Sequence, residues 1–375
     1  MNQHFAKRHG KRTQSGFSLI ELMLALTLGL VVTAGIVQLF VGNNQTTQLI
    51  TGQSRLQESA RYALDFISRS TRNAGFIGCD PEMDKIRNTL NGDWNQIFEY
   101  DILNPIQGFD GTGTGNTLVD WTPSLAALPR SQGGSSFNTV IAGNGVDVAS
   151  LVPGTDILAV RYMLGPGEQL AQAAEKDDDP VIENDGDVPF QTGDFALISD
   201  CEQAALFRIT SIGSTAGGLT LGRGTGVGLF ENANGAAGEL SRIGVSYGGQ
   251  SSGGATSSGA AVVAEVITDI YFVADGAGTN NRGATTSALW RKRGSDAPVE
   301  LVEGISDLQV LYGIDTTLAD NQASANQYVT FGGVGNNVVR SVRVTVQANT
   351  IDVVSDSAEP IARSFTQTIS IRNSG

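Results

Sequence analysis

Apolar residues dominate one long stretch near the start of the chain. Residues 17–41 read FSLIELMLALTLGLVVTAGIVQLFV, 25 positions with Glu21 as the single charge. A helix rises about 1.5 Å per residue, so a run of this length can cross a bilayer. The leader before it holds no acid and four basic residues, Lys7, Arg8, Lys11 and Arg12. This basic flank predicts an N-terminus that stays in the cytoplasm, with everything after the run exported.

An apolar stripe at helical spacing follows. Residues 1–80 contain no proline. Apolar side chains recur three, four or seven positions apart, at Leu49, Leu56, Ala60, Ala63, Leu64 and Ile67. This pattern predicts one amphipathic helix from about Phe17 to about Asn73, with Gly75 as its stop signal. The stripe needs a sheet to cover it, and the polar stretch Asn43–Thr47 is a weaker patch where the helix could bend.

From Phe76 to Gly375 the pattern changes to short alternating or apolar runs between glycine-rich turns. Such runs predict sheets with one face buried. The expected strands are Thr139–Ile141, Asp156–Leu164, Phe195–Ile198, Ala205–Ile212, Ala261–Ala274, Ala288–Arg293, Asp307–Tyr312, Val338–Gln347 and Ser364–Ile371. The expected long loops are residues 104–136, 165–192, 213–228, 248–260 and 275–286. The fold class is therefore α+β, a long N-terminal helix packed on an antiparallel β-sheet head with long loops.

Charge and histidine content exclude several functions. The 24 Lys and Arg against 38 Asp and Glu give a net charge of −14, which disfavours nucleic acid as a partner. Both histidines, His4 and His9, lie in the leader. A chain that began at residue 17 would therefore lack Ser-His-Asp, Cys-His and HExxH chemistry. No GxGxxG motif and no Walker A lysine occurs, so we expect no enzyme activity and no cofactor.

The remaining candidates for chemistry are few. Cys79 and Cys201 are the only cysteines, and an even count in an exported head predicts a disulfide. The acidic stretch 175–187 lacks the EF-hand spacing, so we interpret it as a solvated loop and expect no metal site. The basic triplet 291–293 is interpreted as protection of a strand edge rather than a DNA contact.

The junction before the apolar run has unusual chemistry. Glu21 lies four residues after Phe17, inside the run, and an acid within a membrane is costly and normally has a partner. Cleavage between Gly16 and Phe17 would create that partner, a new terminal ammonium on a neighbouring subunit. A secretory signal peptide is cut after its apolar run, whereas this cut precedes it. The apolar helix would therefore remain in the mature protein.

This junction resembles the class III signal of type IV prepilins and type II secretion pseudopilins. The resemblance covers Gly16, Phe17, Ser18, Leu19, Ile20, Glu21 and Leu22. It implies cleavage after Gly16 by a prepilin peptidase and N-methylation of Phe17. It also implies that Glu21 guides docking of the subunit into a filament.

The head resembles PilW-type minor pilins. The strand motif GTDILAVRY at 154–162 carries the resemblance, together with 199–201, 205–207, LVEGISDLQVLYG at 301–313, 342–344 and 369–373. The stretch 301–313 is shared more loosely with GspJ-type minor pseudopilins. The resemblance implies a cleaved leader at 1–16, a membrane and filament-core helix at 17–75, and an exported head at 76–375.

The resemblance implies a structural role. The chain would be a minor pilin that primes polymerisation of a type IV pilus with other minor pilins, near the tip. Its expected partners are the prepilin peptidase, other minor pilins, the major pilin and the inner membrane, with a tip adhesin as a further candidate. It would be a single-pass inner-membrane protein with a periplasmic head, and then part of the surface pilus. Two alternatives stay open, a minor pseudopilin of a type II secretion system and an adhesive or DNA-binding tip module.

Overall fold

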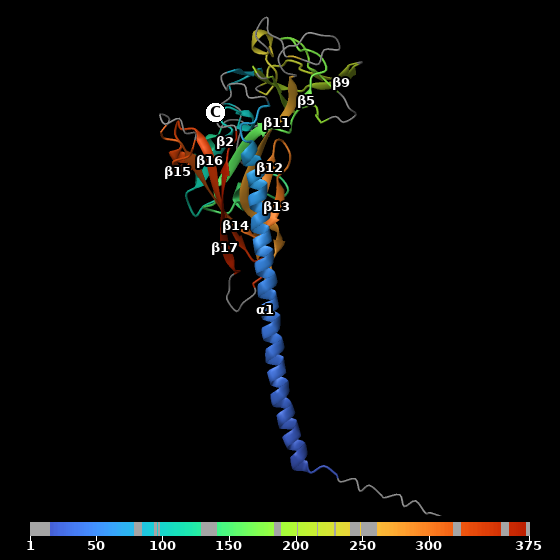
Figure 1. Ribbon diagram of the computed structural model, residues 1–375, viewed down its shortest axis with the longest axis vertical. Helices are drawn as coiled ribbons and strands as arrows, with labels where there is room; N and C mark the ends of the chain where they lie inside the picture. Colours follow the sequence, from blue (N-terminus) through green and yellow to red (C-terminus); the bar gives the residue numbers. More distant parts are fainter. Residues whose placement is uncertain are drawn as a thin grey trace, which may run out of the picture. The chain divides into compact units, whose positions relative to one another are not determined.

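The computed structural model divides the chain into two compact units, Met1–Gly52 and Gln53–Gly375 (Figure 1). It describes the following residues: 16–78, 85–93, 96, 98–128, 141–183, 189–200, 202–215, 217–228, 230–240, 248, 261–317, 324–353 and 360–372.

One helix, α1, runs from Leu19 to Asn73, within two residues of its predicted start. It stays helical through the polar patch, where Thr46 and Thr47 donate their hydroxyls to carbonyls four residues earlier, 2.9 Å away. The expected bend is therefore absent. The helix ends before Gly75, whose φ of 70° is a left-handed conformation that glycine adopts without a steric cost.

The rest of the described chain is mainly strands and short 3-10 turns. The strands are β1 (Ile86–Asn88), β2 (Ile106–Gly111), β3 (Trp121–Thr122), β4 (Ile157–Met163), β5 (Glu168–Gln169), β6 (Val181–Ile182), β7 (Phe195–Ser199), β8 (Ala204–Arg208), β9 (Ser211–Thr215), β10 (Gly218–Gly222), β11 (Val262–Thr279), β12 (Thr285–Arg293), β13 (Val299–Glu303), β14 (Ile305–Ile314), β15 (Gln327–Val329), β16 (Val339–Asn349) and β17 (Ala362–Ser370). The 3-10 turns are η3 (Phe98–Tyr100), η4 (Leu125–Ala127), η5 (Val148–Ser150), η6 (Gly235–Ala237) and η7 (Phe331–Gly333).

These strands form three sheets. The largest has the order β1-β8-β7-β11-β4-β2-β3, with β12 and β5 also pairing with β11 and β13 pairing with β12. A second sheet has the order β15-β14-β16-β17, and a third β6-β10-β9. The pairing of β1 with β8 is parallel, and every other strand pairing among the described residues is antiparallel. The predicted α+β class is confirmed.

The apolar stripe of α1 lies in the main core of the second unit. Its fully buried members are Leu56, Ala60, Ala63 and Ile67. They share one hydrophobic cluster with side chains from β4, β11 and β12 on one side, and from β14, β16 and β17 on the other. Figure 1 shows this part of α1 beside β12, β13 and β14. The helix is thus covered by sheet, as the stripe predicts.

Several predicted boundaries differ from the structure. The expected strand Ala205–Ile212 is two strands, β8 and β9, and β11 continues to Thr279 through residues predicted as loop. Strands β2 and β10 also lie in predicted loops. Their glycines made them look like turns, but in β2 Gly108 lies where a side chain would collide with the Tyr312 hydroxyl. Most of the expected strand Thr139–Ile141 lies outside the described residues.

Candidate functional site

The first unit presents an apolar surface that nothing in the structure covers. An 18-residue window of α1 has a mean hydropathy of 2.3, and none of it is buried. Phe17 is 87% exposed, and the large apolar side chains from Leu19 to Val41 are exposed with it. A continuous apolar surface of this size marks a membrane or a protein interface. By length and composition this part of α1 is long enough to cross a membrane.

Glu21 lies in the first turn of this helix. Ser18 precedes the first helical residue, and its backbone N–H donates to Glu21 Oε2 at 3.4 Å. The sequence Ser-Leu-Ile-Glu thus has the spacing of a capping box, in which the acid at the third helical position satisfies an unpaired N–H group. The carboxylate also faces the positive end of the helix dipole. Gly16 and Phe17 lie just outside the helix, in the short segment without regular secondary structure that precedes it.

A buried polar cluster ties the end of α1 to β11. Asp269 in β11 has no exposed side-chain surface, and Arg293 of β12 donates to both of its oxygens at 2.8 and 2.9 Å. Ser70 of α1 donates to the same carboxylate at 2.7 Å, and the Tyr162 hydroxyl donates at 2.8 Å. The Tyr271 hydroxyl contacts Ser70 at 2.7 Å. We call these five residues the docking cluster.

The electrostatics of the docking cluster favour a charged pair. Burial acts to raise the pKa of Asp269, but the hydrogen bonds and the charge of Arg293, with the Ser70 and Tyr162 hydroxyls, outweigh it and hold that pKa below its usual range. Burial and the neighbouring carboxylate raise the pKa of Tyr162 to about 12 and that of Tyr271 further. The two phenols therefore stay neutral, and their hydrogen bonds support the carboxylate.

The strand motif 154–162 holds two further buried residues that connect elements, Asp156 and Arg161, besides Tyr162. Asp156 accepts from the N–H groups of Gly111 in β2 and Val310 in β14, at 2.9 and 2.8 Å, and so links the two larger sheets. Its burial raises its pKa to about 7. Arg161 is fully buried, and its guanidinium donates to the carbonyls of Phe98 and Asn104. Tyr162 belongs to the docking cluster, so the motif positions both sheets.

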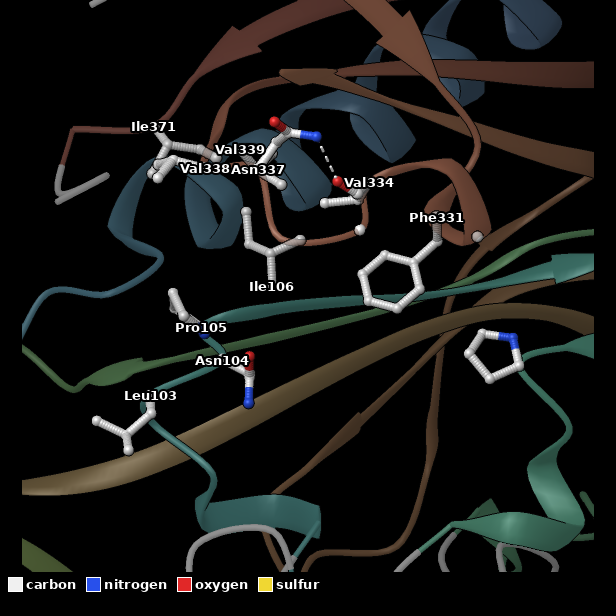
Figure 2. Close-up of a pocket in the computed structure, with 13 residues that line it drawn as sticks. Leu103, Asn104, Pro105, Ile106, Phe331, Val334, Asn337, Val338, Val339 and Ile371 are labelled. Carbon is white, nitrogen blue, oxygen red and sulfur yellow. Dashed lines mark hydrogen bonds between the residues drawn. The ribbon is translucent and has the colours of Figure 1, made fainter. Parts of the chain in front are cut away.

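An apolar pocket of about 560 Å³ lies where β2, η7, β16 and the end of β17 meet (Figure 2). Arg161 fixes one wall by its bond to the Asn104 carbonyl. Figure 2 shows Leu103 and Ile106 on that side, with Phe331 and Ile371 across the opening. Leu103 is 38% exposed, so the pocket opens to the surface. Its lining offers van der Waals contact, and no titratable side chain lines it.

The remaining predicted residues have different outcomes. Cys79 and Cys201 lie outside the described residues, as do two acids of 175–187, Asp185 and Asp187. Asp178 and Asp179 of that stretch accept backbone N–H groups at 2.9 and 2.8 Å. The described residues contain no group of three His, Cys, Asp or Glu that could hold a metal ion.

The interpretation of 291–293 as edge protection is wrong. Arg291 pairs with strands on both sides, β11 and β13, and Lys292, which pairs with β11, is buried. Arg293 serves instead as the cation of the docking cluster. The signal for this cluster was Asp269, an acid inside the apolar run Ala261–Ala274, because a buried carboxylate needs a partner.

Two family models match the chain. Residues 270–364 match the type IV pilus-assembly protein W family, and residues 11–37 match the prokaryotic N-terminal methylation motif. In these two segments the chain is similar to PilW-type, pilin-like proteins. Together the two matches cover less than half of the chain. No curated protein and no solved structure matches it.

Each of the two matches lies in a different unit of the structure, one in Met1–Gly52 and the other in Gln53–Gly375. The methylation motif includes Gly16, Phe17, Glu21 and much of the uncovered apolar surface. The PilW match includes β12, β13, β14 and β16, which cover the stripe of α1, and Arg293 of the docking cluster. The chain is therefore a pilin related to type IV pilus assembly, with an apolar helix consistent with anchoring in the inner membrane.

Proposed function

We propose that this PilW-type chain is a minor pilin that primes polymerisation of a type IV pilus together with other minor pilins, near the tip. The observation that carries the proposal is the uncovered apolar half of α1, which begins just after Gly16 and Phe17 and has Glu21 in its first turn. Such a surface can lie in a bilayer before assembly and against other helices afterwards, without unfolding of the head.

Glu21 supports assembly by its chemistry. In this chain its carboxylate caps the helix that carries it. Cleavage after Gly16 would place an ammonium or methylammonium group on Phe17. Within an apolar filament core, an acid and such a cation on adjacent subunits attract strongly, because little water screens them. Only a register that pairs them avoids a buried unpaired charge.

The head is suited to contacts with other subunits rather than catalysis. The matched families are pilus components, and both histidines of the sequence lie in the leader. We therefore propose no enzymatic role, the other minor pilins, the major pilin and a tip adhesin as partners, and a periplasmic head before assembly. Residues 1–16 would be the leader, 17–75 the anchoring helix and 76–375 the head.

Intact mass tests the processing that this function needs. In cells with the prepilin peptidase we expect a chain that lacks residues 1–16 and carries one added methyl group. In cells without the peptidase we expect the full-length chain. A full-length mass in both strains would contradict the pilin proposal.

Deletion of the gene tests the system in which the chain acts. We expect loss of surface pili and of twitching, with restoration by the wild-type chain and not by an E21A chain that is still cleaved. Normal pili together with loss of exoprotein secretion would instead assign the chain to a type II secretion system.

A further inference from the structure

The strand β17 is the longest edge strand in the described part of the chain. It pairs with β16 over nine residues without a register shift, and the sheet order places no strand on its other side. The other edge strands, β1, β3, β6, β9, β13 and β15, have two to five residues. Proteins commonly block such edges with proline, lysine, bulges or a covering element. In the described part of the chain, β17 has no proline, no lysine and no register shift, and no strand pairs with its outer side.

The register shows which backbone N–H and C=O groups of β17 point away from β16. Thr350 donates its N–H to the Ile361 carbonyl at 2.9 Å, and Ile371 donates to the Arg340 carbonyl at 3.1 Å. Odd-numbered residues of this strand therefore face β16, and even-numbered residues direct N–H and C=O outward. The outward residues are Ala362, Ser364, Thr366, Thr368 and Ser370, all with exposed side chains. They form an uncharged ladder that a further strand can join.

The charge around this edge is opposite to that of the whole chain. The chain has a net charge of −14, whereas the stretches 339–349 and 361–372 hold four arginines and no acid. The connection between them, 350–360, holds the three acids Asp352, Asp356 and Glu359, so residues 339–372 together have one excess positive charge. Arg363 and Arg372 are exposed, and Arg343 stacks on the Tyr328 ring at 3.8 Å. No ion pair within the described residues joins these three to an acid. An acidic segment is therefore favoured beside β17.

A second copy of the chain gains no charge complementarity at this edge. The described strand β17 holds Arg363 and no acid, so its own copy would supply no opposite charge. A partner of opposite charge would pair with it.

The apolar pocket lies next to one end of β17. Its lining includes Val338, Val339 and Ile371, which lie at the start of β16 and immediately after β17 (Figure 2). A strand that follows the edge toward Ser370 would reach the pocket and could place one apolar side chain in it. The backbone ladder would give affinity, and the pocket and the arginines would give selectivity.

We propose that the open edge of β17 binds an acidic extended segment of another protein of the pilus assembly by strand addition, with an apolar side chain of that segment in the pocket. The choice of partner rests on the proposed function, but the edge, its charge and the pocket do not.

Photo-crosslinking of the full-length protein in living cells tests this inference. A benzoylphenylalanine at Thr368 should crosslink to a partner peptide that is acidic and extended, as identified by mass spectrometry. The same probe at Ser214, in the exposed edge strand β9, is the positional control and should not yield this adduct. Crosslinking to a second copy, or no adduct at Thr368, would overturn the proposal.

Matched substitutions test the mode of binding. T366P removes an outward N–H and should reduce the adduct at least tenfold, whereas T366V removes the same side-chain hydroxyl, keeps the N–H and should retain the adduct. R363E should reduce the adduct severalfold and R363K should not. L103D at the pocket opening should also reduce it. An adduct that survives T366P contradicts strand addition, and one that survives L103D contradicts the role of the pocket.

The same cells separate this inference from the proposed function. Each variant should be cleaved after Gly16 and reach the membrane at the wild-type level. If the wild-type chain is processed and supports pili but Thr368 gives no adduct, the strand-addition proposal alone fails. If the chain is not processed in the presence of the peptidase, the proposed function fails.

Discussion

At the scale of single residues, Asp269 connects α1, β4 and β12 through one buried carboxylate. Its carboxylate has no solvent exposure and accepts from Arg293, Ser70 and Tyr162. In D269A these donors would lose their acceptor, and Arg293 would keep a partly buried charge without its partner. We expect a loss of about 3–5 kcal/mol in the free energy of unfolding.

The control for D269A is an exposed ion pair on α1, the helix that carries Ser70. Arg69 and Asp65 are 2.7 Å apart with side chains 76% and 48% exposed. Because water screens this pair, D65A should cost at most about 0.5 kcal/mol. Urea unfolding of a Gln53–Gly375 fragment measures both variants. Equal losses would show that the docking cluster adds no more than a surface pair.

The raised pKa of Glu265 in β11 makes the stability of the second unit depend on pH. Burial first, then the charges of Asp194 and Asp296, raise its pKa from 4.5 to about 7. Between these two pH values the folded state keeps a proton on Glu265 that the unfolded state has released. The contribution of Glu265 to the free energy of unfolding is therefore fully present below pH 4.5 and is lost as the pH rises toward 7. Asp156 acts in the same direction, between 3.8 and about 7.

The fragment should therefore be more stable at pH 5 than at pH 8. Because Glu265 is only partly buried, its share should be of order 1 kcal/mol after screening is considered. E265Q should remove this share and flatten the pH dependence, with urea midpoints at both pH values as the measurement. A steeper dependence in E265Q would contradict the assignment.

At the scale of elements, close packing explains why one strand escaped the sequence analysis. Gly108 in β2 lies against the Tyr312 hydroxyl of β14 and near Phe331, and a Cβ at Gly108 would collide with that hydroxyl. We expect G108A to cost roughly 1–3 kcal/mol. Y312F, which removes the hydroxyl, should recover part of that loss.

The control for G108A is Gly213 in β9. A Cβ there meets no atom within 4 Å, and the residue is exposed. G213A should change stability by less than about 0.5 kcal/mol. If thermal unfolding shows equal effects for G108A and G213A, the contact between β2 and β14 is not the cause.

The sequence predicted those elements whose packing repeats with a local period. The alternation of Val342, Val344 and Val346 located β16, and the stripe from Leu56 to Ile67 located the buried face of α1. Strand β2 was missed because its glycines serve a contact with a distant strand. The bond between Ser70 and Asp269 joins residues 199 positions apart, so no local pattern could pair them.

The sequence predicted the residues of the candidate site that form a local motif and missed those that only the fold brings together. The processing motif is local in sequence, because Gly16, Phe17 and Glu21 lie within six residues of one another. The pocket and the open edge of β17 exist only after the sheets have formed, since Leu103 and Ile371 are brought together by the fold. The pocket and the open edge of β17 could therefore not be predicted from the sequence.

At the scale of the whole molecule, the described neighbours of the two cysteines lie together. A Cβ at Gly78, which precedes Cys79, would be 3.3 Å from the Cβ of Ser199, two positions before Cys201. Beyond the cysteines, β1 pairs with β8 from Ile86 and Ala204 onward. The described segments that flank the two cysteines in sequence are therefore close to each other. This supports the predicted disulfide, which would close a loop of about 122 residues (201 minus 79) and contribute up to about 4–5 kcal/mol by loop entropy.

Protein taken from the periplasmic face should therefore resist alkylation until a reductant is added, and its mass should be 2 Da below that of the reduced chain. The double variant C79S and C201S should unfold at a lower urea concentration than the oxidised wild type and at a similar concentration to the reduced one. Alkylation of both thiols in unreduced protein would contradict the disulfide. Because the bond would tie the segment after α1 to the start of β8, its loss should weaken the second unit and leave cleavage after Gly16 unchanged.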